Sequence, residues 1–113
     1  MSKQQNKDLK TQFLERKQEM GIFQISFEDS ESLWVGGAPD ISTIQNRIVF
    51  TLKHSNAIDN DLSYMYKHHG EAKMRFEILE KFEFEPDAYL RRGILKTKIT
   101  HWAETRNAKI MRI

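Results

Sequence analysis

The sequence predicts one α/β domain of the α+β type, with a small three-stranded antiparallel sheet flanked by helices. The chain has 113 residues, of which 39% are hydrophobic and 30% are charged. This length suits a single domain that can bury a core without disulfides or metals. Segments with a period of two alternate with longer segments of helical period, in the order helix, two strands, two helices, strand, helix.

Three segments show the alternation that is typical of strands. Gly21–Phe27 places apolar residues on both sides and is rich in β-branched and aromatic residues. Leu33–Val35 follows an acidic turn and ends at Gly36 and Gly37, so these two segments predict an antiparallel hairpin. In Lys73–Phe82, Met and Phe alternate with charged residues, which predicts the third strand.

Four segments show helical spacing: Lys7–Glu19, Asp40–His54, Asp59–Gly70 and Asp87–Trp102. The second begins at a good N-cap residue, and its apolar stripe is Ile41, Ile44, Ile48 and Leu52. We expect three parts along the chain: an N-terminal helical extension at residues 1–19, the domain at residues 20–102, and a basic tail at residues 103–113.

The composition excludes several kinds of site. With no cysteine, the chain has no disulfide framework, no thiolate zinc ligand and no cysteine nucleophile. No apolar run approaches the roughly 18 residues that a membrane span requires, and residues 1–10 are too polar for a signal peptide. We therefore expect a cytoplasmic protein that makes no contact with a membrane.

Basic residues gather toward the end of the chain. Residues 91–113 contain seven Lys or Arg residues and a single acidic residue, whereas the chain as a whole carries a net charge of +2. Such a basic end indicates a polyanion partner, although a solvated helix face and a frayed terminus would have the same composition. The candidate nucleic-acid contacts are Arg47, Lys53, Arg91, Arg92, Lys96 and Lys98.

Two tripeptides resemble the paired signature of the GIY-YIG nuclease superfamily. Gly21–Phe23 reads GIF, and Trp34–Gly36 reads WVG, with Trp34 thirteen residues after Gly21. A helix that begins at Asp40 and a later strand at Phe76–Glu80 follow in the order of that family. The resemblance covers residues 20–82. The motif positions are Gly21, Ile22, Phe23, Trp34, Val35, Gly36 and Ile44.

The resemblance implies hydrolysis of DNA phosphodiesters with one divalent metal ion. The family uses two signature tyrosines, an arginine on the first helix and a metal-binding glutamate on a later helix. Here the corresponding residues are Phe23, Trp34 and Ile44, and the window Leu90–Lys96 holds no glutamate. None of these side chains can activate water, hold phosphate charge or bind Mg²⁺. We therefore expect no catalytic residue to be intact and no cofactor, with Mg²⁺ relevant only if nuclease activity survives.

Three functions remain open at this point. The first is a GIY-YIG-like domain that binds DNA or another nucleic acid without cleaving it. The second is an active endonuclease with a displaced site, in which Arg47 replaces the family arginine and a glutamate within Glu77–Glu85 holds the metal. The third is an interaction or regulatory domain that pairs with a protein through its N-terminal helix.

Other residues admit a functional and a structural interpretation. Trp34 and Trp102 could stack on bases, but their apolar neighbours favour positions in the core. His68 and His69 could bind a metal, but adjacent residues of a helix point about 100° apart and do not form a clamp. Surface or capping roles are the simpler interpretation for both histidines.

Overall fold

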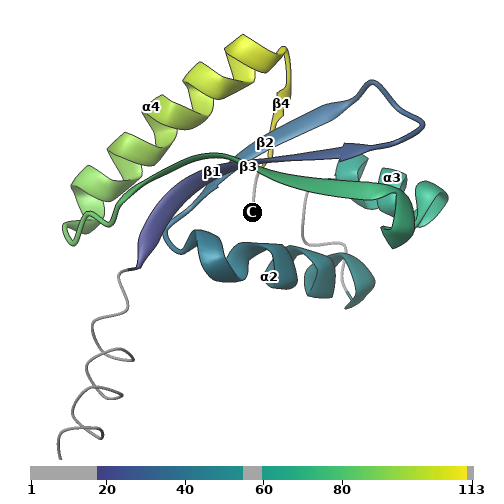
Figure 1. Ribbon diagram of the computed structural model, residues 1–113, viewed down its shortest axis with the longest axis horizontal. Helices are drawn as coiled ribbons and strands as arrows, with labels where there is room; N and C mark the ends of the chain where they lie inside the picture. Colours follow the sequence, from purple (N-terminus) through teal and green to yellow (C-terminus); the bar gives the residue numbers. More distant parts are fainter. Residues whose placement is uncertain (1–17, 55–59, 112–113) are drawn as a thin grey trace, which may run out of the picture.

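The computed structural model describes residues 18–54 and 60–111, which form an α+β fold with helices on both faces of a sheet (Figure 1). Three α-helices and four strands are present in these residues. In chain order the elements are β1 (Glu19–Phe27), β2 (Leu33–Ala38), α2 (Ile41–His54), α3 (Asn60–His69), a 3₁₀ turn (Glu71–Lys73), β3 (Met74–Glu83), α4 (Ala88–Arg106) and β4 (Lys109–Ile110).

The sheet is mixed and has four strands, in the order β3-β1-β2-β4. The expected hairpin and third strand are confirmed, because β1 pairs antiparallel with both β2 and β3. The expectation of a three-stranded, purely antiparallel sheet is wrong, because β4 adds a parallel strand beside β2. The pairing continues past β4, where the Met111 N–H donates to the Val35 carbonyl at 2.8 Å.

The expected ends of the domain also differ from the structure. Glu19 is the first residue of β1, so the predicted N-terminal helix does not reach it; residues 7–17 of that helix lie outside the described residues. At the other end, residues expected as a basic tail continue α4 and form β4, and Met111 is buried in the core. The domain therefore extends at least to Met111.

Local capping explains where the helices begin and end. The Asp40 carboxylate accepts a hydrogen bond from the Ser42 N–H at 3.1 Å, which confirms Asp40 as the N-cap of α2. Gly70 follows α3 with φ of 81°, a conformation that favours glycine. The Asp87 carboxylate accepts from Tyr89 and Leu90, and α4 then runs to Arg106, four residues beyond the predicted end.

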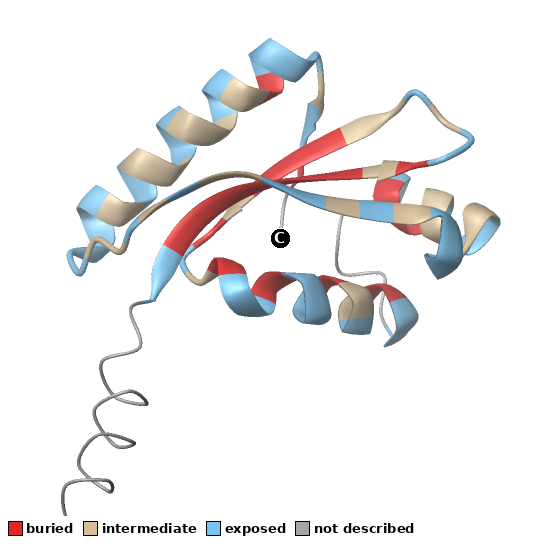
Figure 2. Cartoon of the chain, viewed as in Figure 1, coloured by how far each residue is buried: buried red, intermediate tan, exposed pale blue. Residues whose placement is uncertain are grey.

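A dense apolar cluster lies between the sheet and α2. Figure 2 shows the buried positions on the strands and on the side of α2 that faces them. We call this side of the sheet the α2 face. All four stripe residues of α2 are buried, as predicted. The buried members are Phe23, Ile25, Phe27, Trp34, Ala38, Ile41, Ile44, Ile48, Leu52, Leu62 and Met111.

The opposite side of the sheet, the α4 face, has a smaller core. Its buried residues are Ile22, Val35 and Ala103, with half-buried Leu95, Ile99 and Trp102 of α4 packed on them. Helix α4 is therefore mostly half-buried or exposed along its length (Figure 2). The two helices α2 and α4 lie on opposite sides of the sheet (Figure 1).

A β-bulge in β3 decides which of its side chains face each helix. Phe23 pairs with Ile78, whereas Ile22 pairs with Glu80, so Leu79 is an extra residue between the two pairs. Before the bulge, Ile78 and Phe76 pair with Phe23 and Ile25 and share the α2 face. After it, Glu80 and Phe82 pair with Ile22 and Met20 and share the α4 face.

Candidate nucleic-acid interface

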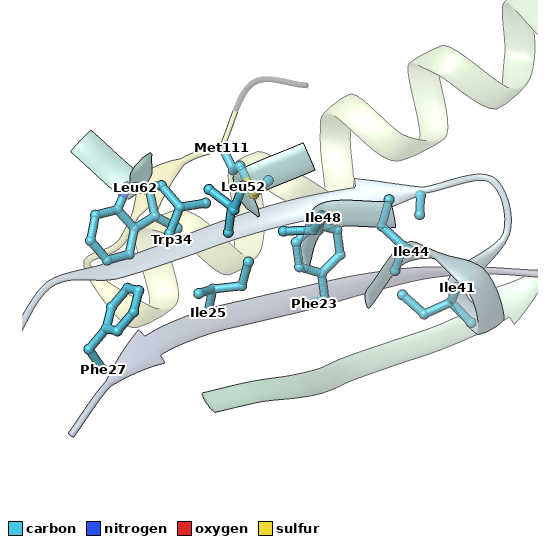
Figure 3. Packing of buried hydrophobic residues seen from close by; sticks show 11 residues of the cluster. Phe23, Ile25, Phe27, Trp34, Ile41, Ile44, Ile48, Leu52, Leu62 and Met111 are labelled. Carbon is cyan, nitrogen blue, oxygen red and sulfur yellow. The ribbon is translucent and has the colours of Figure 1, made fainter. Parts of the chain in front are cut away.

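Phe23, Trp34 and Ile44, the residues compared above with two signature tyrosines and an arginine, lie on the α2 face and are buried. The exposed fraction is 0% for Phe23, 0% for Trp34 and 2% for Ile44. Figure 3 shows Phe23 and Ile44 within the layer of side chains between the strands and α2, with Trp34 further along it. The place where the family would hold its two tyrosines and arginine is therefore solid hydrophobic core.

Close packing leaves no room for a reacting group near Phe23. The Phe23 ring stacks on the Phe76 ring with centroids 5.2 Å apart. A Cβ added at Gly36 would lie 2.6 Å from the Phe23 Cζ, so glycine is required where β2 passes over this ring. The Phe23 ring is thus closely packed and has no hydroxyl that could position water.

The fourth motif position lies on the other side of the sheet. The window Leu90–Lys96, where the family glutamate is expected, belongs to the first half of α4. Helix α4 packs on the α4 face through Leu95 and Ile99, away from Phe23 and Ile44. The structure therefore does not bring the four motif positions into one site.

The parts of the displaced endonuclease site also lie apart. Arg47 is exposed on α2, beside Phe50 and Thr51 in a small surface hollow of about 390 Å³. Glu80 lies on the α4 face, where it accepts hydrogen bonds from Lys98 Nζ at 2.6 Å and Trp102 Nε1 at 2.9 Å. Within residues 18–54 and 60–111, no three His, Asp or Glu side chains form a group that could hold a metal ion.

The environment of Glu80 favours its ionised form. The hydrogen bond from Lys98 and then that from Trp102 hold the pKa of Glu80 below its ordinary value, although partial burial acts in the opposite direction. Through these two hydrogen bonds the ionised Glu80 carboxylate joins β3 to α4. Trp102, a candidate base-stacking residue, is likewise part of this contact, and Trp34 is fully buried.

The six predicted nucleic-acid contacts separate into two groups. Arg47 and Lys53 are on α2, and Lys53 forms an ion pair with Glu71 at 3.0 Å. Arg91, Arg92, Lys96 and Lys98 are on α4, across the sheet. A single ligand surface cannot include both groups without wrapping around the domain.

Among the four predicted contacts on α4, Arg91 and Lys98 hold their charges against groups of the fold. Arg91 Nη1 donates to the Glu85 carbonyl at 3.0 Å, and its guanidinium lies 4.9 Å from the centre of the Phe84 ring. Lys98 pairs with Glu80 and lies 4.8 Å from the centre of the Phe82 ring. The alkyl stems of such residues cover aromatic surface while their charges stay near water. These contacts fix the inner side of α4.

Arg92 and Lys96 point outward. Both are exposed, and neither makes an ion pair within the part of the chain that the structure describes. They are four residues apart, so they are neighbours on the helix surface. Their charges are therefore available to an external anion.

A shallow groove of about 840 Å³ lies along the first half of α4, between Tyr89 and Lys98. Its described lining includes Arg92, Lys96 and Thr97 and no acidic residue. Gly93 lies in the middle, and a Cβ placed there would meet nothing within 4 Å. At the N-terminal end stands Tyr89, whose side chain is 80% exposed. The groove thus combines positive charge, an open backbone position and an accessible aromatic ring.

The sequence analysis did not single out Tyr89. The spacing of Tyr89, Gly93 and Thr97 at intervals of four residues was a usable signal, because such residues share one helix face. That face is hard to recognise in the sequence because the inner side of α4 also carries Arg91 and Lys98.

The histidines do not form a metal site in the described residues. The His68 ring packs against Tyr64 with centroids 3.9 Å apart, and the His69 ring packs against Phe27 at 5.7 Å. The two rings therefore contact different neighbours. A bilayer-crossing helix is also absent from residues 18–54 and 60–111, where the longest helix, α4, contains six charged residues.

No protein-family model, curated protein or solved structure matches this chain. Its function therefore has to be inferred from the chemistry of the described surface.

Proposed function

We propose that this protein is a nucleic-acid-binding domain that contacts phosphates through the outer face of α4 and does not hydrolyse them. The observation that carries the proposal is the groove on α4, whose described lining contains the exposed cations Arg92 and Lys96 and no carboxylate. Phosphate contacts to Lys and Arg supply most of the affinity of nonspecific nucleic-acid binding.

The absence of hydrolysis follows from the chemistry of the α2 face. Phe23, Trp34 and Ile44 are packed in a core without a hydroxyl or carboxylate among them. Cleavage of a phosphodiester at that place would need an activated water and a group that stabilises the phosphate charge. The groove on α4 offers cations but no carboxylate in its described lining to hold a metal ion.

The GIY-YIG-like scaffold is part of the same proposal. Its support is the hairpin of β1 and β2, in which Phe23 pairs with Gly36, together with the helix that places Ile44 over the same sheet face. The position of α4 across the sheet is the feature that departs from the site the family implies. We therefore propose a shared hairpin-and-helix scaffold with a binding surface on the other face.

Binding can be tested by fluorescence anisotropy with labelled DNA and RNA oligonucleotides across a salt series. Two engaged cations predict a slope of log K against log salt of roughly −1.4 for single strands and −1.8 for duplex. The double variant Arg92→Ala/Lys96→Ala should lose most of the affinity at low salt. The matched double variant Arg47→Ala/Lys53→Ala, which removes the same charge from the opposite side, should bind like wild type.

Two results would overturn this proposal. One is the absence of binding at low salt. The other is an equal loss in both double variants, since a nonspecific effect of net charge would then explain the data. Plasmid incubated with the same protein and Mg²⁺ or Mn²⁺ should stay intact. Cleavage that disappears in Arg47→Ala would instead favour the displaced endonuclease site.

A further inference from the structure

We infer that the ligand of the α4 groove is a single strand, with Tyr89 as the platform on which one base stacks. This inference rests on the proposed function and adds the class of nucleic acid. Its structural basis is the position of one accessible ring at the end of a basic groove.

The Tyr89 ring is available, whereas other aromatic rings near α4 are already covered. Cations of the protein lie over Phe82, Phe84 and Trp102 at 4.8, 4.9 and 5.6 Å from the ring centres. No ring or cation among the described residues lies against Tyr89, which is 80% exposed. Both faces of its ring are therefore open to a base.

The backbone beneath this ring is held in place. The Asp87 carboxylate accepts hydrogen bonds from the N–H groups of Tyr89 and Leu90 at 2.9 and 3.0 Å. This N-cap fixes the first turn of α4 while the Tyr89 side chain extends into solvent. A stacked base would thus meet a ring whose attachment point is already ordered, which lowers the entropic cost of binding.

Phosphate contacts lie along the helix from the ring. Arg92 and Lys96 follow Tyr89 by three and seven residues, so all three share one side of α4 over about 10 Å. Gly93 between them leaves open space in which a strand can approach the helix backbone. A strand that stacks one base on Tyr89 would therefore place its next phosphates beside Arg92 and Lys96.

The same face is poorly suited to a duplex. In double-stranded DNA each base is stacked on its neighbours, so its flat face cannot reach a tyrosine. A helix that reads the major groove needs side chains that hydrogen-bond to base edges along its outer side. Here that side carries Gly93, Thr97 and Thr100, besides Arg92 and Lys96, which are assigned to phosphates. Stacking on an exposed ring therefore favours a single strand.

Anisotropy with a labelled single strand and with the duplex of the same sequence tests this inference on the full chain. We expect the single strand to bind at least tenfold more tightly. Tyr89→Ala should weaken single-strand binding about 5- to 100-fold and leave its salt slope unchanged, since the lost contact is not ionic. Tyr89→Phe, which keeps the ring, should bind within about twofold of wild type.

Tyr64→Ala provides the matched control, because Tyr64 is also exposed but lies on α3. It should bind like wild type, and circular dichroism should show that all three variants are folded. Duplex binding as tight as single-strand binding would overturn the inference, and so would unchanged single-strand binding by Tyr89→Ala. The proposed function is tested separately by the double variant Arg92→Ala/Lys96→Ala. Equal binding of heparin would also overturn it, as a general polyanion or an acidic protein surface would then be the ligand. No binding to any nucleic acid would overturn both.

Discussion

The two faces of the sheet are built in different ways. Among the described residues, eleven buried side chains form the cluster on the α2 face, whereas three form that on the α4 face. The α4 face is completed by half-buried residues and by contacts that involve charge, such as Lys98 with Glu80 and Arg91 with Phe84. The α2 face therefore supplies most of the hydrophobic stabilisation, and the α4 face leaves a basic helix surface open to solvent.

The two faces also differ in what they offer to a ligand. Phe23, Trp34 and Ile44 on the α2 face are buried and add apolar area that stabilises the fold. Arg92 and Lys96 on α4 are exposed and do not depend on those positions. The two faces should consequently respond differently to substitution.

The largest expected effect is that of an arginine placed at Ile44 in the core of the α2 face. Ile44→Arg places a guanidinium within the buried cluster, and we expect a loss of about 5 kcal/mol, close to the whole stability of a small domain. Circular dichroism and urea unfolding would measure it. The control Gln45→Arg adds the same group at an exposed neighbour and should stay within about 0.5 kcal/mol. A folded Ile44→Arg protein with an unchanged midpoint would contradict the assigned core.

Truncation of one apolar side chain on each face measures the difference directly. Phe23→Ala should destabilise the protein by about 3–5 kcal/mol, because the ring is fully buried. Leu95→Ala on the α4 face should cost about 1–2 kcal/mol, because that side chain is only half-buried. Urea unfolding of both variants gives the two values, and equal losses would show that the faces contribute alike.

The N-cap of α4 is expected to have a smaller effect. Asp87→Ala removes the acceptor for the Tyr89 and Leu90 N–H groups and should cost about 1 kcal/mol. Thermal unfolding would measure the loss, and hydrogen exchange should quicken at those two amides. Asp87→Asn retains an acceptor oxygen and should restore most of the stability. Unchanged exchange in Asp87→Ala would argue against the cap.

The smallest effect concerns the ion pair between β3 and α4. Because the folded state holds the pKa of Glu80 below its unfolded value, this carboxylate stabilises the fold above about pH 4 and loses that contribution as the pH falls through the folded pKa. Glu80→Gln should therefore cost about 0.5–1 kcal/mol at pH 7 and less at pH 3. Urea unfolding at both pH values, with Glu77→Gln as the comparison on the same strand, would show the difference. A cost at pH 3 as large as that at pH 7 would contradict this role of Glu80.

The sequence predicted the α2 face better than the α4 face for physical reasons. The stripe of α2 has clean helical spacing, and all four of its residues are buried. The inner side of α4 instead includes Arg91 and Lys98, which pack against aromatic rings. The apolar residues of α4 therefore do not follow a clear helical spacing. Strand β4 has only two residues, too few for any alternation to be recognised.

The candidate site was predicted in part. Arg92 and Lys96 were among the six predicted contacts, and the structure leaves both exposed on one helix side. The placement of Arg47 and Lys53 across the sheet was not predictable from charge. The bulge at Leu79 decides which side chains of β3 face α4, and it has no clear sequence signal.

The pairing of β2 with β4 has a consequence for how the chain is made. Val35 and Met111 are bonded across 76 positions of the sequence, and the Met111 side chain completes the core beneath α2. During synthesis the hairpin, α2 and β3 leave the ribosome well before this last strand. Until β4 forms, the edge of β2 stays unpaired. Contacts over such a long sequence separation slow folding, and an unpaired edge is prone to aggregation.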